Sequence, residues 1–181
     1  MNCNWSRDRF TEALHFAAES HGNQKVPGSD IPYLYHITLV AMEIIAALQQ
    51  GFAGNPDLAV QCALLHDVME DAGRKYEELH GKFGNAVAEG VLALTKDPNI
   101  QKNMRMQDSI VRIKRQPYEI WMVKMADRIS NLRKPPDFWT ASKIIAYKNE
   151  ACMIYEELSE ADESLGKRLL AKIQEYDNNY C

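Results

Sequence analysis

The sequence has few cysteines and no long hydrophobic run, and these absences exclude several classes of protein. Cys3, Cys62, Cys152 and Cys181 are widely separated and form no Cys-x-x-Cys pair, so neither a zinc–cysteine cluster nor a disulfide framework is predicted. The longest apolar stretch, ITLVAMEIIAAL, is interrupted by Glu43 and is too short to span a bilayer, and the N-terminal MNCNWSRDRF lacks the apolar core of a signal peptide. We therefore expect a soluble, cytoplasmic protein with reduced cysteines and no membrane partner.

The chain also lacks an excess of basic residues. Lysine and arginine total 21 against 25 acidic residues, which gives a formal net charge of -4. Proteins that bind a nucleic-acid backbone usually present a dominant basic surface, so we expect no nucleic-acid partner. A small anionic ligand held by local lysines and arginines is compatible with this charge. With 181 residues, 46% of them hydrophobic, the chain suits one compact domain, residues 1–181.

No segment shows the alternating pattern of a half-buried strand. Apolar residues instead recur at spacings of three and four, as in FTEALHFAAES, HITLVAMEIIAALQQ, DLAVQCALLHDVMED and NEACMIYEELSEA, which is typical of amphipathic helices. Glycine and proline gather at the breaks GNQKVPGSDIP, GFAGNP, DPN, QP and RKPPD, and residues 27–30 are predicted to form a surface loop. The pattern predicts an all-α bundle of about eight helices, the last of them the amphipathic segment ADESLGKRLLAKIQEYDNNY.

One predicted helix carries an unusual cluster of polar residues. In ALLHDVMEDAG, a histidine and three acids occupy six positions of an otherwise apolar segment that we expect to remain helical to about Gly73. On such a helix Glu70 lies one turn after His66, and Asp71 one turn after Asp67. Burying like charges together is costly unless a cation compensates. Imidazole with carboxylate suits a divalent ion such as Mn²⁺, Fe²⁺ or Zn²⁺, and other helices must supply further ligands.

Two residues elsewhere are candidates for those ligands. His36 opens an apolar helix just after IPYLY, and Asp127 lies in the apolar segment IWMVKMADRISNL. Each also has a simpler interpretation, since His36 suits a helix cap or a core position and Asp127 suits an ion pair with Arg128. Their joint occurrence with the cluster favours a metal site. Cys62, one turn before the cluster, is interpreted as a packing residue.

The order H…HD…D, with each part on a different predicted helix, resembles the HD-domain metal-dependent phosphohydrolases. HDVMED is similar to the HDxxED motif of the Rel/Spo (p)ppGpp hydrolase domain and the stand-alone small alarmone hydrolases, and KMADRISNLR and PYLYH are similar to two further motifs of that family. Together with WTASKIIAYKNEA, the resemblance covers about residues 10–160. It implies a compact HD-domain helical bundle, followed here by the C-terminal helix.

The resemblance also implies an activity and the residues that carry it. The expected reaction is metal-dependent hydrolysis of the 3′-pyrophosphate of ppGpp or pppGpp, which yields GDP or GTP and pyrophosphate, by a hydrolase without synthetase activity. The ion in this family is Mn²⁺, although the ligand types tolerate other divalent ions. The implied metal ligands are His36, His66, Asp67 and Asp127, and the implied catalytic acid pair is Glu70 and Asp71.

Five further residues are implied as substrate contacts. Asn131 matches a position that contacts the ribose region, and Lys143 and Tyr147 resemble a basic residue and a tyrosine used near the phosphates. Lys96 is a weaker candidate for the same role. Lys25 stands where the family usually has an arginine that packs on guanine. Lysine lacks the planar guanidinium, so guanine selectivity is expected to differ.

That departure keeps a second enzyme hypothesis open, in which the same metal site hydrolyses a deoxynucleotide, a cyclic nucleotide or NADPH. A third hypothesis is a non-catalytic module that binds metal and nucleotide. The sequence does not decide the native metal, the division of roles between Glu70 and Asp71, or whether the chain forms a homo-oligomer.

Overall fold

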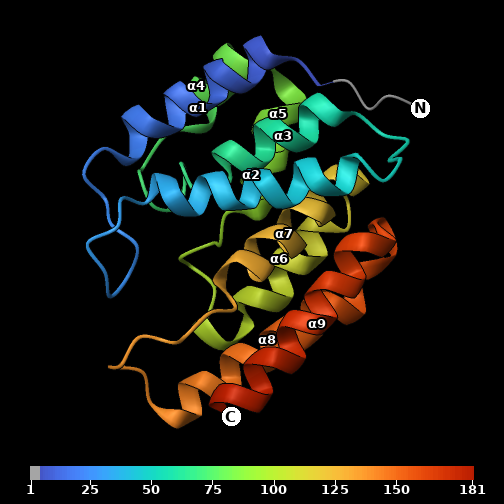
Figure 1. The fold of residues 1–181 in the computed structure, drawn as a ribbon. Helices are drawn as coiled ribbons and strands as arrows, with labels where there is room; N and C mark the ends of the chain where they lie inside the picture. The colour runs from blue at the N-terminus through green and yellow to red at the C-terminus, as the bar shows by residue number, and fades with distance from the viewer. Residues whose placement is uncertain (1–4) are drawn as a thin grey trace.

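The computed structural model describes residues 5–181, and within that range the protein consists of helices and connecting loops (Figure 1). The nine α-helices are α1 (Arg7–His21), α2 (Leu34–Leu48), α3 (Pro56–Leu65), α4 (Tyr76–Phe83), α5 (Asn85–Leu94), α6 (Arg105–Ile113), α7 (Tyr118–Asn131), α8 (Ala141–Leu158) and α9 (Glu163–Tyr180). Short 3₁₀ helices, η1 (Lys102–Met104) and η2 (Ser159–Ala161), precede α6 and α9. The predicted all-α fold is confirmed, with one helix more than the approximate count of eight.

Helix α7 is the centre of the bundle. It contacts α2 and α3 on one side and α8 and α9 on the other, and Figure 1 shows it between α2 above and the α8–α9 pair below. Eleven of its fourteen residues are buried, including the charged side chains of Lys124 and Arg128. Because Asp127 lies on this helix, the fold carries a carboxylate into the interior.

Several helices begin at residues that cap them. The Asn55 side chain accepts a hydrogen bond from the Leu58 amide at 3.2 Å, and Pro56 follows at the first helical position of α3. Thr140 caps α8 and Asp162 caps α9 in the same way. Most of the predicted breaks coincide with observed loops.

The sequence analysis missed one break between helices, at Gly84, which separates α4 from α5. Its φ of 84° lies in the left-handed region that only glycine adopts readily.

The prediction that the HDVMED segment is helical was wrong. Helix α3 ends at Leu65, and the chain continues to Gly73 as a series of turns. The Val68 amide donates to the Leu65 carbonyl, three residues back, at 3.1 Å, and the Arg74 amide donates to the Val68 carbonyl at 3.0 Å. The polar side chains of this segment bond to other parts of the molecule, Asp67 to Tyr33, Glu70 to Lys96 and Asp71 to Gln24.

The remaining structural expectations concern the loops, the cysteines and the membrane. Residues 27–30 form the predicted exposed loop, which is closed by an isolated bridge between Lys25 and Pro32. Cys62 is buried in the core and, like Cys152 and Cys181, is a free thiol, while Cys3 lies outside the described residues. Over residues 5–181, none of the helices combines the length and apolar character needed to cross a bilayer.

Candidate metal centre and active site

The structure brings the four predicted metal ligands together from three segments of the chain. His36 lies near the start of α2, His66 and Asp67 follow the end of α3, and Asp127 lies on α7. The Nε2 atoms of the two histidines are 3.2 Å apart. Asp67 Oδ2 is 2.9 Å from His66 Nε2 and 3.6 Å from His36 Nε2. Asp127 Oδ1 is 3.5 Å from His36 Nε2 and 3.8 Å from His66 Nε2.

The other ring nitrogens of the histidines have partners that fix the orientation of each ring. His66 Nδ1 donates to the Ala63 carbonyl at 2.8 Å, and His36 Nδ1 is 3.0 Å from the hydroxyl of the buried Ser130. A neutral His66 therefore carries its proton on Nδ1 and presents the lone pair of Nε2 to the cluster. Partners of this kind are typical of histidines that bind metal ions.

The two carboxylates are also held by neighbouring side chains. Tyr33 donates its hydroxyl proton to Asp67 Oδ2 at 2.5 Å. Lys124 donates to Asp127 Oδ2 at 3.1 Å, and the Asn131 amide donates to Asp127 Oδ1 at 2.7 Å. Each carboxylate is thus held by hydrogen bonds from neighbouring side chains.

The charges of the cluster depend on one another. Burial opposes the imidazolium form of His66, but the adjacent Asp67 carboxylate outweighs burial and raises the pKa of His66 to about 9. Burial likewise opposes ionisation of Asp67, yet the two imidazoles hold the pKa of its carboxyl well below its usual range. Lys124 and His66 overcome the burial of Asp127 and lower its pKa to about 2. At neutral pH a protonated imidazole therefore lies between two ionised carboxylates.

These groups fit a divalent cation. His36, His66 and Asp67 each offer a ligand atom, and the three atoms lie within 4.8 Å of one another. Both histidines are buried, with exposed fractions of 5% and 3%. Two imidazole nitrogens only 3.2 Å apart require a proton or a cation between their lone pairs. The combination of imidazole and carboxylate suits Mn²⁺, Fe²⁺ or Zn²⁺.

The acid pair lies just beyond this cluster, and its two members have different surroundings. Both oxygens of Glu70 are bonded to Lys96, whose ammonium donates to Oε1 at 2.9 Å and whose backbone amide donates to Oε2 at 3.0 Å. Asp71 accepts one hydrogen bond on Oδ2, from the Gln24 side chain at 3.0 Å. Burial lowers the pKa of Lys96, but the Glu70 carboxylate outweighs it, so the pKa is raised and the side chain stays charged.

All these groups open into one cavity of about 430 Å³. Its lining includes every predicted site residue except Lys25 and Lys143, and it adds flat and basic side chains, among them Tyr35, Trp139 and Arg133. Arg133 lies over the Tyr35 ring, 5.2 Å from its centroid, and donates to its hydroxyl at 3.0 Å. The cavity thus combines a cation site with aromatic and positive surfaces, which suits an anionic ligand that carries a ring.

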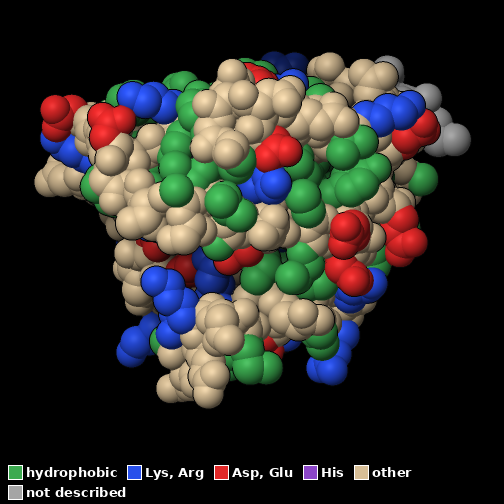
Figure 2. Space-filling model, turned by 90° about the horizontal axis from the view of Figure 1, so that it is seen from below, with side chains coloured by type: hydrophobic (Ala, Val, Ile, Leu, Met, Phe, Trp, Pro, Cys, Tyr) green, Lys and Arg blue, Asp and Glu red, His purple; other side chains and the backbone are tan. Residues whose placement is uncertain are grey.

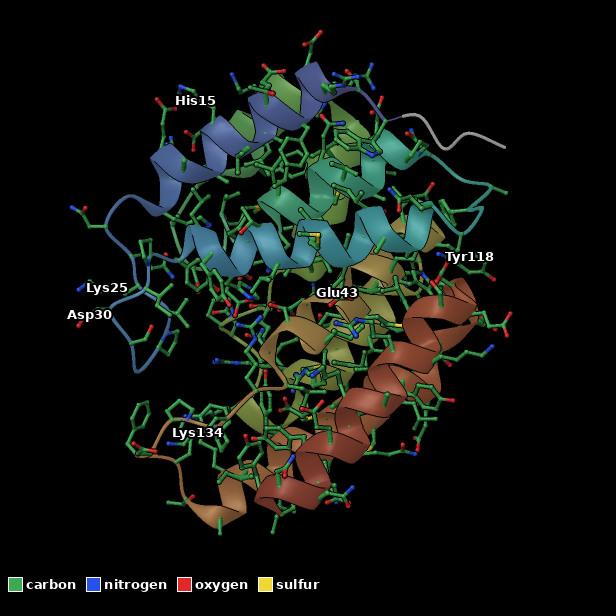
Figure 3. The ribbon with its side chains drawn as sticks, viewed as in Figure 1. His15, Lys25, Asp30, Glu43, Tyr118 and Lys134 are labelled. Atoms are coloured by element: carbon green, nitrogen blue, oxygen red, sulfur yellow. The ribbon has the colours of Figure 1, made fainter. Side chains whose placement is uncertain are left out.

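Two other features of the molecular surface are a second hollow and the distribution of charge. A larger, more open hollow of about 840 Å³ lies elsewhere and is lined by other residues, including Tyr118, which Figure 3 shows on the opposite side from Lys25. On the face seen in Figure 2, basic side chains are interspersed with acidic and hydrophobic ones and form no continuous basic surface.

Comparison with known proteins agrees with this geometry. A family model described as HD domain matches residues 13–163, which is most of the chain. The chain belongs to the HD-domain family. The match begins within α1 and ends at the start of α9, so it includes all four candidate metal ligands of this HD domain.

The similar proteins within that family are named as hydrolases of guanosine polyphosphates. The chain is 30% identical over 174 residues to guanosine-3′,5′-bis(diphosphate) 3′-pyrophosphohydrolase MESH1 of Danio rerio, covering 93% of this chain and 94% of that protein. It is 28% identical over 131 residues to the bifunctional (p)ppGpp synthase/hydrolase SpoT of Escherichia coli, covering 69% of this chain and 18% of that protein. This HD domain is therefore homologous to the MESH1 and SpoT hydrolases.

A solved structure extends the likeness to the fold. It is described as a metazoan orthologue of SpoT that hydrolyses ppGpp and plays a role in starvation responses. The two structures superpose with a TM-score of 0.81 at 25% identity, covering 95% of this chain and 97% of the other. The predicted HD-domain architecture is confirmed.

Two predicted substrate contacts of this HD domain lie outside the cavity lining. Lys25 forms an ion pair with Asp30 in the exposed α1–α2 loop, where Figure 3 shows the two side chains together. Lys143, on the first turn of α8, places its ammonium 4.1 Å from the centroid of the Trp139 ring. Trp139 itself lines the cavity and packs edge-on against Tyr147. Lys143 thus contacts a residue of the cavity lining, whereas Lys25 is paired with Asp30 outside the lining.

The sequence analysis missed three residues that hold the site together. Tyr33, Gln24 and Ser130 bond respectively to Asp67, Asp71 and His36. Tyr33 belongs to the quoted PYLYH motif and Ser130 to KMADRISNLR, so their positions gave a signal that went unused. Gln24 lies in a loop with no periodic pattern, and its role depends on a contact across 47 residues of sequence.

Proposed function

We propose that this HD domain hydrolyses the 3′-pyrophosphate of ppGpp and pppGpp, with GDP or GTP and pyrophosphate as products. The observation that carries the proposal is the convergence of the four candidate ligands and the acid pair on one cavity. Similarity over nearly the whole length of a named 3′-pyrophosphohydrolase supports the choice of substrate. Mn²⁺ is the proposed ion, held by His36, His66, Asp67 and Asp127.

A divalent ion at this position supplies Lewis acidity, which polarises a phosphoryl oxygen and makes water easier to deprotonate. The protein contributes the placement of proton acceptors beside the reacting phosphorus. In the reaction a bond forms between the water oxygen and phosphorus, the bond from phosphorus to the 3′ oxygen breaks, and one water proton ends on the 3′ oxygen. Asp71 Oδ1 is the proposed carrier of that proton, because only the other oxygen of Asp71 has a partner among the described residues.

The proposed role of Glu70 is different. Both of its oxygens are bonded to Lys96, so the pair forms a fixed dipole at the rim of the cavity. Lys96 is proposed to contact the substrate phosphates, since its charge faces the same cavity and its side chain is already ordered by Glu70. Glu70 then orients both this ammonium and the attacking water.

The remaining substrate contacts are assigned by position. Asn131, next to Asp127, is proposed to meet the ribose region, and Tyr147 and Lys143 the phosphates. Burial raises the pKa of Tyr147 to about 12, so its hydroxyl is a proton donor at neutral pH. Lys25 is proposed as a base contact, which requires its exposed ion pair with Asp30 to open. Exposed pairs are worth at most about 1 kcal/mol, so this opening costs little.

The position of Lys25 also supports a second candidate substrate. Because this side chain is engaged outside the cavity, the base is met instead by the flat surfaces of Tyr35, Arg133 and Trp139. Such surfaces stack on any ring system and select guanine less strictly than hydrogen bonds do. Another nucleotide, such as NADPH, a deoxynucleotide or a cyclic nucleotide, is therefore the alternative substrate.

We also propose a cytoplasmic location, consistent with free thiols at all three cysteines that the structure describes.

The decisive experiment is a substrate panel. Purified protein loaded with Mn²⁺ is given ppGpp, pppGpp, dGTP, cyclic nucleotides and NADPH, and products are separated by ion-exchange chromatography. The expected result is GDP and pyrophosphate from ppGpp, abolished by EDTA and by Asp67→Ala. Glu70→Gln and Asp71→Asn should each lower kcat at least a hundredfold, while the control Glu77→Gln, on the exposed face of α4, should not.

Two other results would change the assignment. Turnover of another nucleotide without turnover of ppGpp would keep the metal chemistry and replace the substrate. Nucleotide binding without turnover across the panel would favour a non-catalytic module.

A further inference from the structure

Gln24, in the loop after α1, is held at four points. Its backbone amide donates to the His21 carbonyl at 2.8 Å, and its carbonyl accepts from the Tyr33 amide at 2.8 Å. Its side-chain Oε1 is 2.8 Å from His21 Nδ1, and its Nε2 donates to Asp71 Oδ2 at 3.0 Å. A loop glutamine fixed by both its backbone and its side chain is unusual, because such residues are normally free to rotate in solvent.

The direction of these hydrogen bonds follows from the chemistry of the groups. An ionised carboxylate only accepts, so Gln24 must turn its NH₂ group toward Asp71 and its oxygen toward His21. His21 then donates from Nδ1. The other ring nitrogen, His21 Nε2, is buried and has no hydrogen-bond partner within residues 5–181. The contacts therefore form a directed chain from His21 through Gln24 to Asp71.

The same end of α1 also supports the metal cluster. The His21 ring packs against the Tyr33 ring, with centroids 4.9 Å apart, and Tyr33 donates to Asp67. His21 is 5% exposed, so this contact is part of the interior. One buried histidine thus anchors two side chains, one of which reaches a candidate metal ligand and the other the acid pair.

The backbone of Asp71 is held by one hydrogen bond, from its amide to the Asp67 carbonyl at 2.8 Å, but its side chain needs further support. Residues 66–72 form turns instead of a helix, so the direction of the Asp71 side chain is not set by a regular backbone. The group of Gln24 that donates to Asp71 is an amide. An amide does not ionise over the working pH range, so it presents the same donor to Asp71 at every pH. Holding Oδ2 leaves Oδ1 as the oxygen that faces a reactant.

Building on the proposed function, we propose that Gln24 is a positioning residue that fixes one oxygen of Asp71 so that the other accepts and returns the proton during hydrolysis, with His21 anchoring Gln24. It acts through Asp71, to which its NH₂ group donates, and its side-chain hydrogen bonds go to Asp71 and His21 and to none of the four candidate metal ligands. Its loss therefore affects the rate of the chemical step more than binding of the substrate or the ion.

The test compares Gln24→Met, which keeps the volume and neutrality of the side chain but removes its donor and acceptor, with the wild type. The matched control is Gln107→Met at an exposed position of α6. With Mn²⁺ and ppGpp, we expect kcat to fall about 10- to 100-fold for Gln24→Met, as for other orienting hydrogen bonds, and KM and the Mn²⁺ dissociation constant to change less than about threefold. His21→Leu should reproduce part of this loss.

A measurement independent of turnover accompanies the kinetics. In NMR spectra of ¹⁵N-labelled protein, the two side-chain amide protons of Gln24 should shift when Asp71 is changed to Ala, and those of Gln107 should not. This arm also serves if Gln24→Met fails to fold, because it uses the wild-type glutamine. No shift would overturn the contact, and hence the proposal.

The kinetic outcomes are equally decisive. An unchanged kcat in Gln24→Met would overturn the positioning role. So would a fall in kcat that comes with a similar fold-loss of Mn²⁺ affinity, or with a large drop in melting temperature. Wild-type protein that leaves ppGpp intact would instead overturn the proposed function. The role of Gln24 would then be decided by the amide shifts and by the substrate that the panel identifies.

Discussion

Binding of Mn²⁺ should displace a proton from the cluster, and the structure gives the size of the effect. With the pKa of His66 at about 9, its imidazole is almost fully protonated at pH 7. A cation binds only the neutral ring, so titration of EDTA-treated protein with Mn²⁺ at pH 7 should release about one proton from His66. Removing that proton two pH units below the pKa costs about 2.7 kcal/mol. This cost weakens binding about a hundredfold relative to protein in which His66 is already neutral.

The sign of the pH dependence follows. The raised pKa stabilises the protonated form that competes with the ion, so affinity should rise about tenfold per pH unit between about pH 6 and about pH 8 and level off near pH 9. Calorimetric titrations in buffers of different ionisation enthalpy measure both the affinity and the protons released. His15→Gln is the control, since His15 lies exposed on α1, away from the cluster (Figure 3). Release of no proton at pH 7, or an affinity that does not change with pH, would refute the reasoning.

Three substitutions test other contacts of the site. Tyr33→Phe removes one hydrogen bond to Asp67 without changing volume greatly, so the Mn²⁺ dissociation constant should rise about tenfold while melting temperature, followed by circular dichroism, falls only slightly. Lys96→Met should raise KM for ppGpp at least tenfold in steady-state assays, because a charge-assisted phosphate contact is lost; an unchanged KM would exclude that contact. Lys25→Ala should raise KM for ppGpp more than about threefold if Lys25 contacts the base as proposed; a smaller change would mean that its ion pair with Asp30 stays closed when the nucleotide binds.

The candidate metal ligands could be expected from the sequence because their residue types are out of place. A carboxylate at Asp127 within an apolar helix, and a histidine and acids at the end of another, are costly without a compensating charge. The structure brings these residues within a few ångströms of one another, as the pattern required. The all-α fold could be expected from the spacing of apolar residues by three and four positions, which extends through α2, α3 and α7.

What the sequence could not provide is the direction of individual side chains. The apolar spacing continues through HDVMED, so the pattern predicted a helix there. Helix α3 instead ends at Leu65, and the polar side chains that follow contact other segments. Lys25 stands at the expected position, but its local partner Asp30 turns it away from the cavity. Gln24 is an ordinary loop residue until the fold brings Asp71 beside it. In each case a tertiary contact outweighs the local preference.

The proposed division of roles within the acid pair rests on the same contacts. Two carboxylates one residue apart in sequence are chemically similar, but Glu70 has both oxygens engaged by Lys96 and Asp71 has one engaged by an uncharged amide. A carboxylate that is ion-paired through one oxygen and bonded to a backbone amide through the other is a poor proton carrier, because protonation would break the ion pair. A carboxylate with one unengaged oxygen can accept a proton and release it without reorganising its neighbours. Asp71→Asn should therefore lower kcat with little effect on KM, whereas Glu70→Gln should change both, since it also releases Lys96.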